Sequence, residues 1–265
     1  MEYDSSTCKE KLILFYLKIK LNMNILFVFS MKKELIFLLN KFNNVNEEKI
    51  GEYTLYNMKY QEFNIYILYS KIGLVNAAIS LTKVLNKIKP NYIINAGTAG
   101  GHDFNINTGE IVLAKEVINI NEIETSYKEA NEGSNSLDWK LLTFYEDEDK
   151  DFKDDIKIYY GDENLIQKFK NVGQENNIKL IEGRVGSGDI WNKEKDRIKY
   201  FNQNYSTLCE EMEIYSVYKI ASQESIPCLG LKIISNNEMN GQKYDPNVSE
   251  KLDEFLYKFI VDSVK

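Results

Sequence analysis

The sequence is poor in histidine, and this shortage excludes whole classes of chemistry. Among 265 residues there is one histidine, His102. Catalysis by Ser-His-Asp or Cys-His groups is therefore excluded unless His102 serves, and a metal site with two histidine ligands is excluded outright. We predict that His102 is a polar loop residue, and that the protein uses neither a metal ion nor a cofactor.

Arginine is also scarce, with Arg184 and Arg197 the only two among 33 basic residues. Its guanidinium offers phosphate and carboxylate groups a bidentate fork that lysine cannot supply. A mechanism that uses phosphate therefore has few candidate residues. With 40 acidic side chains the net charge is −7, so we do not expect nucleic acid as a partner.

Cysteine usage indicates a reducing compartment. Cys8, Cys209 and Cys228 are an odd, scattered set without a CxxC pair. Such a set fits free thiols better than a disulfide framework. We therefore predict a cytoplasmic protein.

The first 22 residues are unlike the rest of the chain. Their apolar stretch, Lys11–Leu21, is interrupted by three lysines and preceded by acidic residues, unlike a signal peptide. It is also shorter than the roughly 20 apolar residues of a membrane span. We interpret residues 1–22 as an N-terminal extension: additional reading frame, a packed edge helix or a membrane anchor, the last being the least favoured. We predict residues 23–265 to be a single domain without a membrane partner.

From residue 23 onward, apolar runs typical of buried strands alternate with segments of helical periodicity. Strands are predicted at 25–29, 53–58, 64–69, 92–96, 111–114, 179–186 and 228–234, and helices at 31–39, 74–88, 163–175, 211–222 and 248–264. This alternation predicts an α/β fold, a three-layer α/β/α sandwich with a mixed central β-sheet. Residues 119–157 carry no clear pattern, and the charges at 146–155 indicate a solvated loop.

Ligands in such folds collect at the carboxyl ends of the strands, and polar residues follow several strands here. The glycine-rich stretch 97–101 is predicted as a turn that lets the backbone approach a ligand. Taken singly, Glu34 and the acids at 210–213 are typical of solvated helix N-termini. Trp191 is typical of core packing or of a platform for a flat ring, and 235–237 of a turn.

What changes these interpretations is that short motifs occur together, in order, near the ends of strands. They are FSMKKEL at 29–35, SKIGLVNAA at 70–78, PNYIINAGTAGG at 90–101, TGEIVLA at 108–114, GSGDIW at 186–191, EMEIYSV at 211–217 and PCLGLKIISN at 227–236. As an ordered set they resemble the purine nucleoside phosphorylase superfamily, and within it most of all the methylthioadenosine/S-adenosylhomocysteine nucleosidases. The resemblance covers nearly all of 23–265 except 119–157.

The resemblance implies a single α/β/α domain, commonly a homodimer, that acts on a small purine nucleoside. The implied reaction is hydrolysis of the N-glycosidic bond of 5'-methylthioadenosine or S-adenosylhomocysteine, giving adenine and the thio-ribose. In the family the region that corresponds to 119–157 contributes to the dimer contact and reaches the partner's pocket.

The resemblance also implies roles for individual residues. Glu34 matches the general base that takes a proton from water, and Glu213 matches the carboxylate that holds the ribose hydroxyls. Met212 matches an apolar wall of the sugar pocket, Thr98 a residue near the ribose, and Trp191 an aromatic residue that stacks on the purine. The remaining substrate-binding positions that we predict are Met31, Ala99, Gly100, Glu211, Lys232 and Ser235.

Two positions depart from the nucleosidase pattern. Asn236 stands where these enzymes have an aspartic acid that protonates the purine N7, and an amide cannot donate that proton. Asn236 can still orient the base, so we include it among the predicted catalytic residues. Lys232 stands where an arginine is usual, which keeps the charge and loses the fork.

Three alternatives follow from these departures. Asn236 suits a 6-oxopurine nucleoside as well as an adenine nucleoside, so hydrolysis of such a substrate is one alternative and its phosphorolysis is a second. Since the phosphorylases place an arginine just before the glycine stretch, where this chain has Asn95-Ala96, we favour water over phosphate. A nucleoside-binding protein with weakened catalysis is the third alternative.

Overall fold

The computed structural model describes residues 23–142 and 156–263. The N-terminal extension 1–22 and the acidic stretch 146–155 lie outside the described residues. Within the described part, none of the helices combines the length and the apolar character that a membrane crossing requires.

The core of the protein is one mixed sheet of ten strands. Its strands are β1 (Met23–Phe29), β2 (Asn46–Ile50), β3 (Tyr53–Tyr60), β4 (Phe63–Tyr69), β5 (Tyr92–Gly101), β6 (Ile111–Asn119), β9 (Ile158–Tyr160), β10 (Leu180–Ser187), β11 (Thr207–Glu211) and β12 (Cys228–Asn236). The order is β11-β10-β6-β12-β5-β1-β4-β3-β2, with β9 added to β6. β1, β4, β5 and β12 run parallel, whereas β2 and β3 are antiparallel additions.

One half of this sheet closes on itself. β11 pairs in parallel with β10 and also in antiparallel register with β5, where Glu210 lies opposite Gly100. The strands β5, β12, β6, β10 and β11 therefore form a ring. Closure brings the carboxyl end of β11 against the carboxyl end of β5, which is where the site is found.

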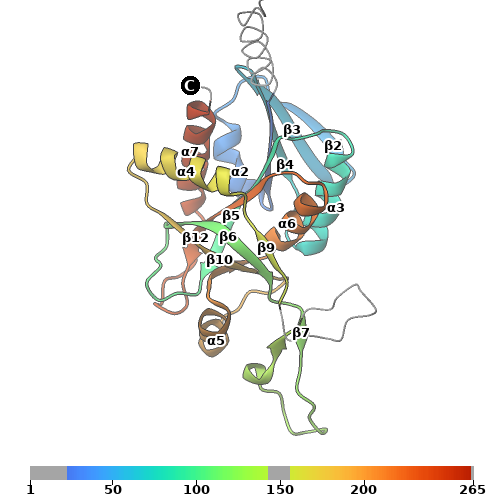
Figure 1. Cartoon of the computed structure of the whole chain (residues 1–265), viewed down its shortest axis with the longest axis vertical. Helices are drawn as coiled ribbons and strands as arrows, with labels where there is room; N and C mark the ends of the chain where they lie inside the picture. Colours follow the sequence, from blue (N-terminus) through green and yellow to red (C-terminus); the bar gives the residue numbers. More distant parts are fainter. Residues whose placement is uncertain (1–22, 143–155, 264–265) are drawn as a thin grey trace, which may run out of the picture.

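Helices cover both faces of the sheet (Figure 1). α2 (Lys32–Leu39), α4 (Glu163–Glu175) and α7 (Val248–Asp262) share one apolar cluster, and α3 (Leu74–Leu85) and α6 (Ile214–Gln223) share another on the opposite face. Each helix buries one apolar stripe, as amphipathic helices do on a sheet. The predicted three-layer α/β/α architecture is thus confirmed.

Three local expectations were wrong. The glycine stretch 97–101 is no turn but the end of β5, because both β12 and β11 pair with it. The helix expected from Glu211 begins at Ile214, and Glu211 ends a strand instead. A further helix, α5 (Lys195–Tyr205), was not predicted; it packs on a third, smaller apolar cluster.

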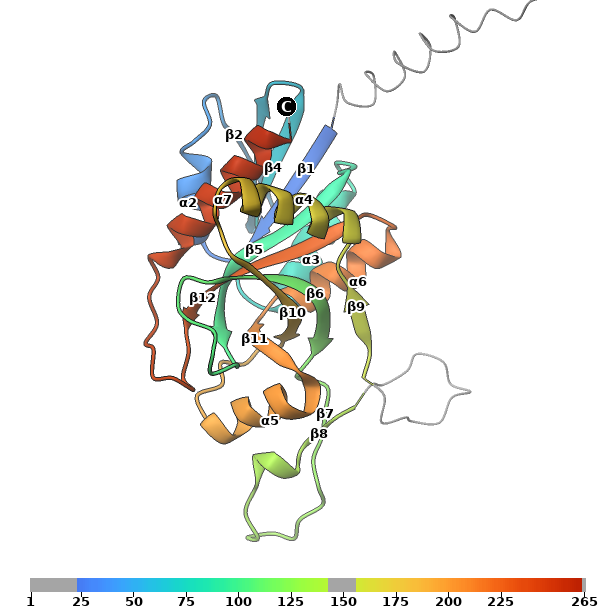
Figure 2. The same cartoon turned by 60° about the vertical axis from the view of Figure 1, so that its left-hand side comes forward.

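The stretch without a clear pattern contains a small projection beyond the sheet. Two short strands, β7 (Ile123–Glu124) and β8 (Lys140–Leu141), pair in antiparallel fashion, and a 3-10 turn at Ser136–Asp138 lies between them. Both views show this hairpin extending away from the body of the molecule, past α5 (Figure 2). It therefore adds surface without adding to the central core.

A buried carboxyl group ties α7 to α2, the helix that carries Glu34. Asp253 is fully buried, and its Oδ2 accepts a hydrogen bond from the backbone N–H of Leu38 at 2.9 Å. Its Oδ1 has no hydrogen-bond partner within the described part of the chain. Burial raises the pKa of Asp253 to about 8, and the charge of Glu34 adds to this rise. The native protein therefore binds this proton more tightly than the unfolded chain does.

We expect Asp253→Asn to change how stability depends on pH. Between about pH 4 and pH 8 the unfolded chain loses this proton while the native state keeps it, so the wild type loses stability as pH rises. The variant lacks this titrating group. The difference in free energy of unfolding, variant minus wild type, should therefore rise by more than about 1 kcal/mol between pH 5 and pH 8. Urea denaturation at both pH values measures this, with Asp196→Asn on the surface as control. Identical pH dependences of wild type and Asp253→Asn would contradict the expectation.

Candidate active site

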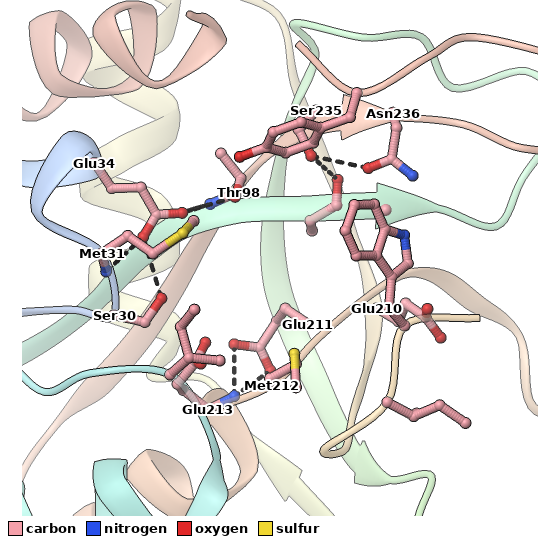
Figure 3. A pocket seen from close by; sticks show the side chains of 16 residues that line it. Ser30, Met31, Glu34, Thr98, Glu210, Glu211, Met212, Glu213, Ser235 and Asn236 are labelled. Atoms are coloured by element: carbon pink, nitrogen blue, oxygen red, sulfur yellow. Dashed lines mark hydrogen bonds between the residues drawn. The ribbon is translucent and has the colours of Figure 1, made fainter. Parts of the chain in front are cut away.

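A cavity lies at the carboxyl ends of β1, β5, β11 and β12 (Figure 3). Its empty volume, open solvent at the mouth included, is about 650 Å³. The side chains that line it are Ser30, Met31, Glu34, Ile72, Thr98, Ala99, Gly100, Ile190, Trp191, Glu210, Glu211, Met212, Glu213, Ser235, Asn236 and Tyr244. Apolar walls with a few convergent polar groups are typical of small-molecule sites.

Eleven of the twelve site residues predicted from the sequence line this one cavity, and Lys232 is buried just behind it. Five lining residues were not predicted: Ser30, Ile72, Ile190, Glu210 and Tyr244. The first three lie inside motifs that the sequence analysis quoted, and Glu210 belongs to its acidic run. Tyr244 has no such signal, because it reaches the cavity from the segment between β12 and α7.

Glu34 is held from both sides and is not a solvated acid, with 1% of its surface exposed. Its Oε1 accepts hydrogen bonds from the backbone N–H and the hydroxyl of Thr98, at 2.8 and 2.7 Å. Its Oε2 accepts from the Ser30 hydroxyl and the Met31 N–H, both at 3.1 Å. A Cβ at Gly97 would lie 3.2 Å from Oε1. A glycine at that position therefore leaves room for the carboxylate.

The acidic run at the end of β11 is buried too, with Glu210, Glu211 and Glu213 each 5% exposed. Glu211 accepts from the N–H of Ile214 at 3.0 Å, at the start of α6, and from the ammonium of Lys232 at 2.8 Å. Burial by itself lowers the pKa of Lys232, but Glu211 and Glu213 outweigh it and the pKa is raised. The ammonium thus stays charged inside the protein.

Glu213 lies at the point where α6 meets the start of α3. Its Oε1 accepts from the N–H of Gly73 at 2.9 Å, at the N-terminal end of α3. That end of a helix carries partial positive charge. Even so, burial and then the charge of Glu211 raise the pKa of Glu213 well above its usual range, against the opposing effect of Lys232.

The opposite wall is formed by the end of β12. The Ser235 hydroxyl donates to Asn236 Oδ1 at 3.0 Å and to the Ala99 carbonyl at 3.2 Å. Asn236 is 4% exposed. The contact with Ser235 directs its Oδ1 toward the protein. Its Nδ2 group makes no protein hydrogen bond within the described residues and is the polar group left for a ligand.

Aromatic side chains stand at the mouth. Trp191 is 53% exposed, and its ring centroid lies 5.8 Å from that of Tyr244 in an edge-to-face arrangement. An exposed tryptophan beside a polar cavity is unusual for core packing. The structure therefore favours the interpretation of Trp191 as a platform for a flat ring.

Neither arginine reaches the cavity. Arg184 is engaged with Glu116 and the Tyr205 carbonyl, and Arg197 donates to the carbonyls of Ser136 and Trp139. Nor do His, Cys, Asp and Glu residues in 23–142 and 156–263 form a group that could hold a metal ion. His102 lies in the loop after β5, as predicted, but it is 2% exposed and hydrogen-bonded to Thr207.

Known proteins resemble the chain over most of its length. The family model described as "Phosphorylase superfamily" matches residues 24–262. A 5'-methylthioadenosine/S-adenosylhomocysteine nucleosidase of Bacillus licheniformis is 27% identical over 216 residues, which are 81% of this chain and 86% of that protein. The enzyme of the same name from Bacillus velezensis is 26% identical over 238 residues, 89% and 93% of the two chains.

Solved structures share the fold. A futalosine hydrolase mutant of Helicobacter pylori superposes with a TM-score of 0.77 at 21% identity, covering 91% of this chain and 99% of that one. An Asp-to-Asn mutant of the H. pylori nucleosidase with 5'-methylthioadenosine in the active site gives 0.76 at 20% identity, covering 91% and 99%.

We expect Lys232→Met to destabilise the protein strongly, because it leaves the buried carboxylate of Glu211 without its cation. Removing one partner of a buried ion pair typically costs about 3–5 kcal/mol. Urea denaturation at pH 7.5 measures the loss. The matched control is Lys115→Met, whose ammonium lies 3.7 Å from Glu163 on the surface, and which should stay within about 1 kcal/mol of wild type. Equal losses in the free energy of unfolding for both variants would show that the buried ion pair stabilises the protein no more than the surface pair does.

Proposed function

The chain belongs to the phosphorylase superfamily, and we propose that it hydrolyses the N-glycosidic bond of 5'-methylthioadenosine and S-adenosylhomocysteine, releasing adenine and the thio-ribose. The observation that carries the proposal is the pair of buried carboxylates, Glu34 and Glu213, that line one cavity together with an aromatic platform. The relatives named after this reaction support it.

Each carboxylate suits a different part of the reaction. As the bond between the sugar C1' and the purine N9 breaks, its electron pair leaves with the base and positive charge develops on the sugar. A carboxylate beside the ribose, Glu213, stabilises that charge most when it is largest, in the transition state. Glu34 accepts the proton of the water that attacks C1', and its hydrogen bonds to Ser30, Met31 and Thr98 fix the orientation of its carboxylate. Met212 provides an apolar wall for the sugar.

The base is held between Trp191 and Asn236. Trp191 stacks on the purine, and the unpartnered Nδ2 of Asn236 donates to the N7 acceptor. An amide has no acidic proton, so the departing base takes its proton from water. Leaving-group activation is consequently the weakest part of this catalytic arrangement.

Water is the nucleophile that the cavity suits best. Phosphate recognition relies on charged, multidentate donors, and both arginines are engaged elsewhere. The ammonium of Lys232 is committed to Glu211 and to the Asn95 amide oxygen, at 2.8 and 2.6 Å.

We also propose a cytoplasmic homodimer. Cys209 and Cys228 are free, buried thiols, which suits a reducing compartment. Ile72, Val75 and Ile79 are exposed by 47%, 66% and 42% along one side of the start of α3, next to the cavity mouth. An apolar stripe of this kind suits burial against a second copy.

We expect adenine to appear when the protein is incubated with 5'-methylthioadenosine or S-adenosylhomocysteine, without any need for phosphate. Chromatography of the free base, with adenosine and inosine as further substrates and phosphate present or absent, measures this. Glu34→Gln should lose at least about 100-fold in rate, the usual scale for a general base, while Glu194→Gln outside the cavity should not. Hypoxanthine from inosine alone would move the assignment to 6-oxopurines, and strict phosphate dependence would contradict hydrolysis.

Asn236→Asp should release adenine faster than wild type, by about tenfold or more, because a carboxyl group can protonate the purine N7. The gain should fade at high pH as the new carboxyl group ionises. Asn240→Asp, close by in the chain, is the control. An unchanged rate would show that base protonation is not limiting. If the wild type released no base, yet a nucleoside raised its melting temperature, the protein would be a binder instead.

A further inference from the structure

The segment that carries the aromatic platform has one buried anchor. Residues 188–194 connect β10 to α5, and Ile190 and Trp191 within them line the cavity. Every residue from 189 to 196 is exposed except Asn192, which is 7% exposed. The position of Trp191 therefore depends directly on how its neighbour Asn192 is held.

Glu210 holds Asn192 through both of its N–H groups. Glu210 Oε1 accepts from the backbone N–H of Asn192 at 2.7 Å, and Oε2 accepts from its side-chain amide. Glu210 itself cannot shift easily, because it lies on β11 where that strand closes the ring against Gly100 of β5. The rigid sheet thus fixes the loop at the residue next to Trp191.

His102 supports this carboxylate from the other side. Its Nε2 lies 3.1 Å from Glu210 Oε2, and its Nδ1 lies 2.8 Å from the hydroxyl of Thr207. The ring is stacked on Phe201 of α5, with the centroids 6.0 Å apart. Burying a carboxylate is costly unless polar groups surround it. The imidazole places a ring nitrogen within ion-pair distance of Glu210, although this Nε2 makes no hydrogen bond of good geometry within the described residues.

We propose that His102, Glu210 and Asn192 form a positioning relay that holds Trp191 against the base of the substrate. None of the three is a catalytic residue in this proposal; they act through the tryptophan. The statement that Trp191 stacks on the base rests on the proposed function. The statement that these three residues fix the position of Trp191 does not. The relay also explains why the one histidine of the chain is buried, although it lies in the loop that follows β5.

Kinetics test the consequence for the substrate. A ring that stacks on the base in the bound substrate and in the transition state contributes uniform binding, so its loss raises KM and leaves kcat nearly unchanged. We expect His102→Phe, which keeps the stack on Phe201 but removes both ring nitrogens, and Asn192→Ala each to raise KM about tenfold. His102→Gln restores a donor toward Glu210 and should recover most of the loss. The double variant should be no worse than the poorer single one, because both act on one loop position.

Fluorescence tests the relay without any substrate. Trp139 and Trp191 are the two tryptophans of the chain, so Trp139→Phe leaves Trp191 as the reporter. In that background, quenching by acrylamide should increase in His102→Phe and Asn192→Ala, and return toward the starting value in His102→Gln. Lys195→Ala, on the exposed start of α5, is the matched control and should change neither KM nor quenching.

The outcomes separate the two proposals. Unchanged quenching in both His102→Phe and Asn192→Ala would overturn the relay, and so would a fall in kcat at constant KM. If no nucleoside is hydrolysed, the proposed function fails while the quenching of the free protein still decides the relay. If His102→Phe does not fold, as its melting curve would show, Asn192→Ala and His102→Gln carry the test alone.

Discussion

The burial of four carboxylates around one cavity is the constraint on which the rest of the site depends. Each of these charges needs donors to be stable away from water, and each is supplied differently. Glu34 has hydroxyl and backbone donors from β1 and β5, and Glu211 has Lys232 together with the start of α6. Glu213 has the start of α3, and Glu210 has the platform loop and a histidine. The hydrogen bonds of these four carboxylates therefore connect the surrounding strands and helices, and the same carboxylates are the reactive groups of the cavity.

Closure of the ring of strands allows so many buried carboxylates to find hydrogen-bond donors. The antiparallel pairing of β11 with β5 places Glu210 opposite Gly100, and β12 pairs with β5 from its other side. Side chains are excluded where these backbones meet. A Cβ at Gly101 would lie 2.7 Å from the Asn237 amide nitrogen. The glycines of β5 thus serve the close approach of strands and of the Glu34 carboxylate.

The layers could be predicted from the sequence because they depend on local patterns, whereas the site residues were predicted from the resemblance of the ordered motifs to a known family. Apolar runs and helical periodicity identify β1, α3 or α7 without reference to any neighbour. The end of β5 was taken for a turn, since only its pairing with two distant strands makes a glycine-rich stretch extended. Taken singly, the acids near β11 are typical of solvated helix N-termini for the same reason: their donors, such as Gly73 and Lys232, come from other parts of the chain. Tyr244 and the burial of His102 likewise follow from tertiary contacts alone.

The balance of charge in the cavity argues for water as nucleophile independently of the missing arginines. Four buried carboxylates share the region with one buried lysine among the described residues, Lys232, and its ammonium is already paired with Glu211. A phosphate dianion entering this space would meet a field of its own sign, and in a partly buried site such repulsion is weakly screened. A neutral nucleoside pays no such cost on binding, yet becomes cationic at the sugar as the glycosidic bond breaks. Burial, followed by the charge of Glu211, raises the pKa of Glu213. The same negative charge favours the transition state of hydrolysis over its ground state.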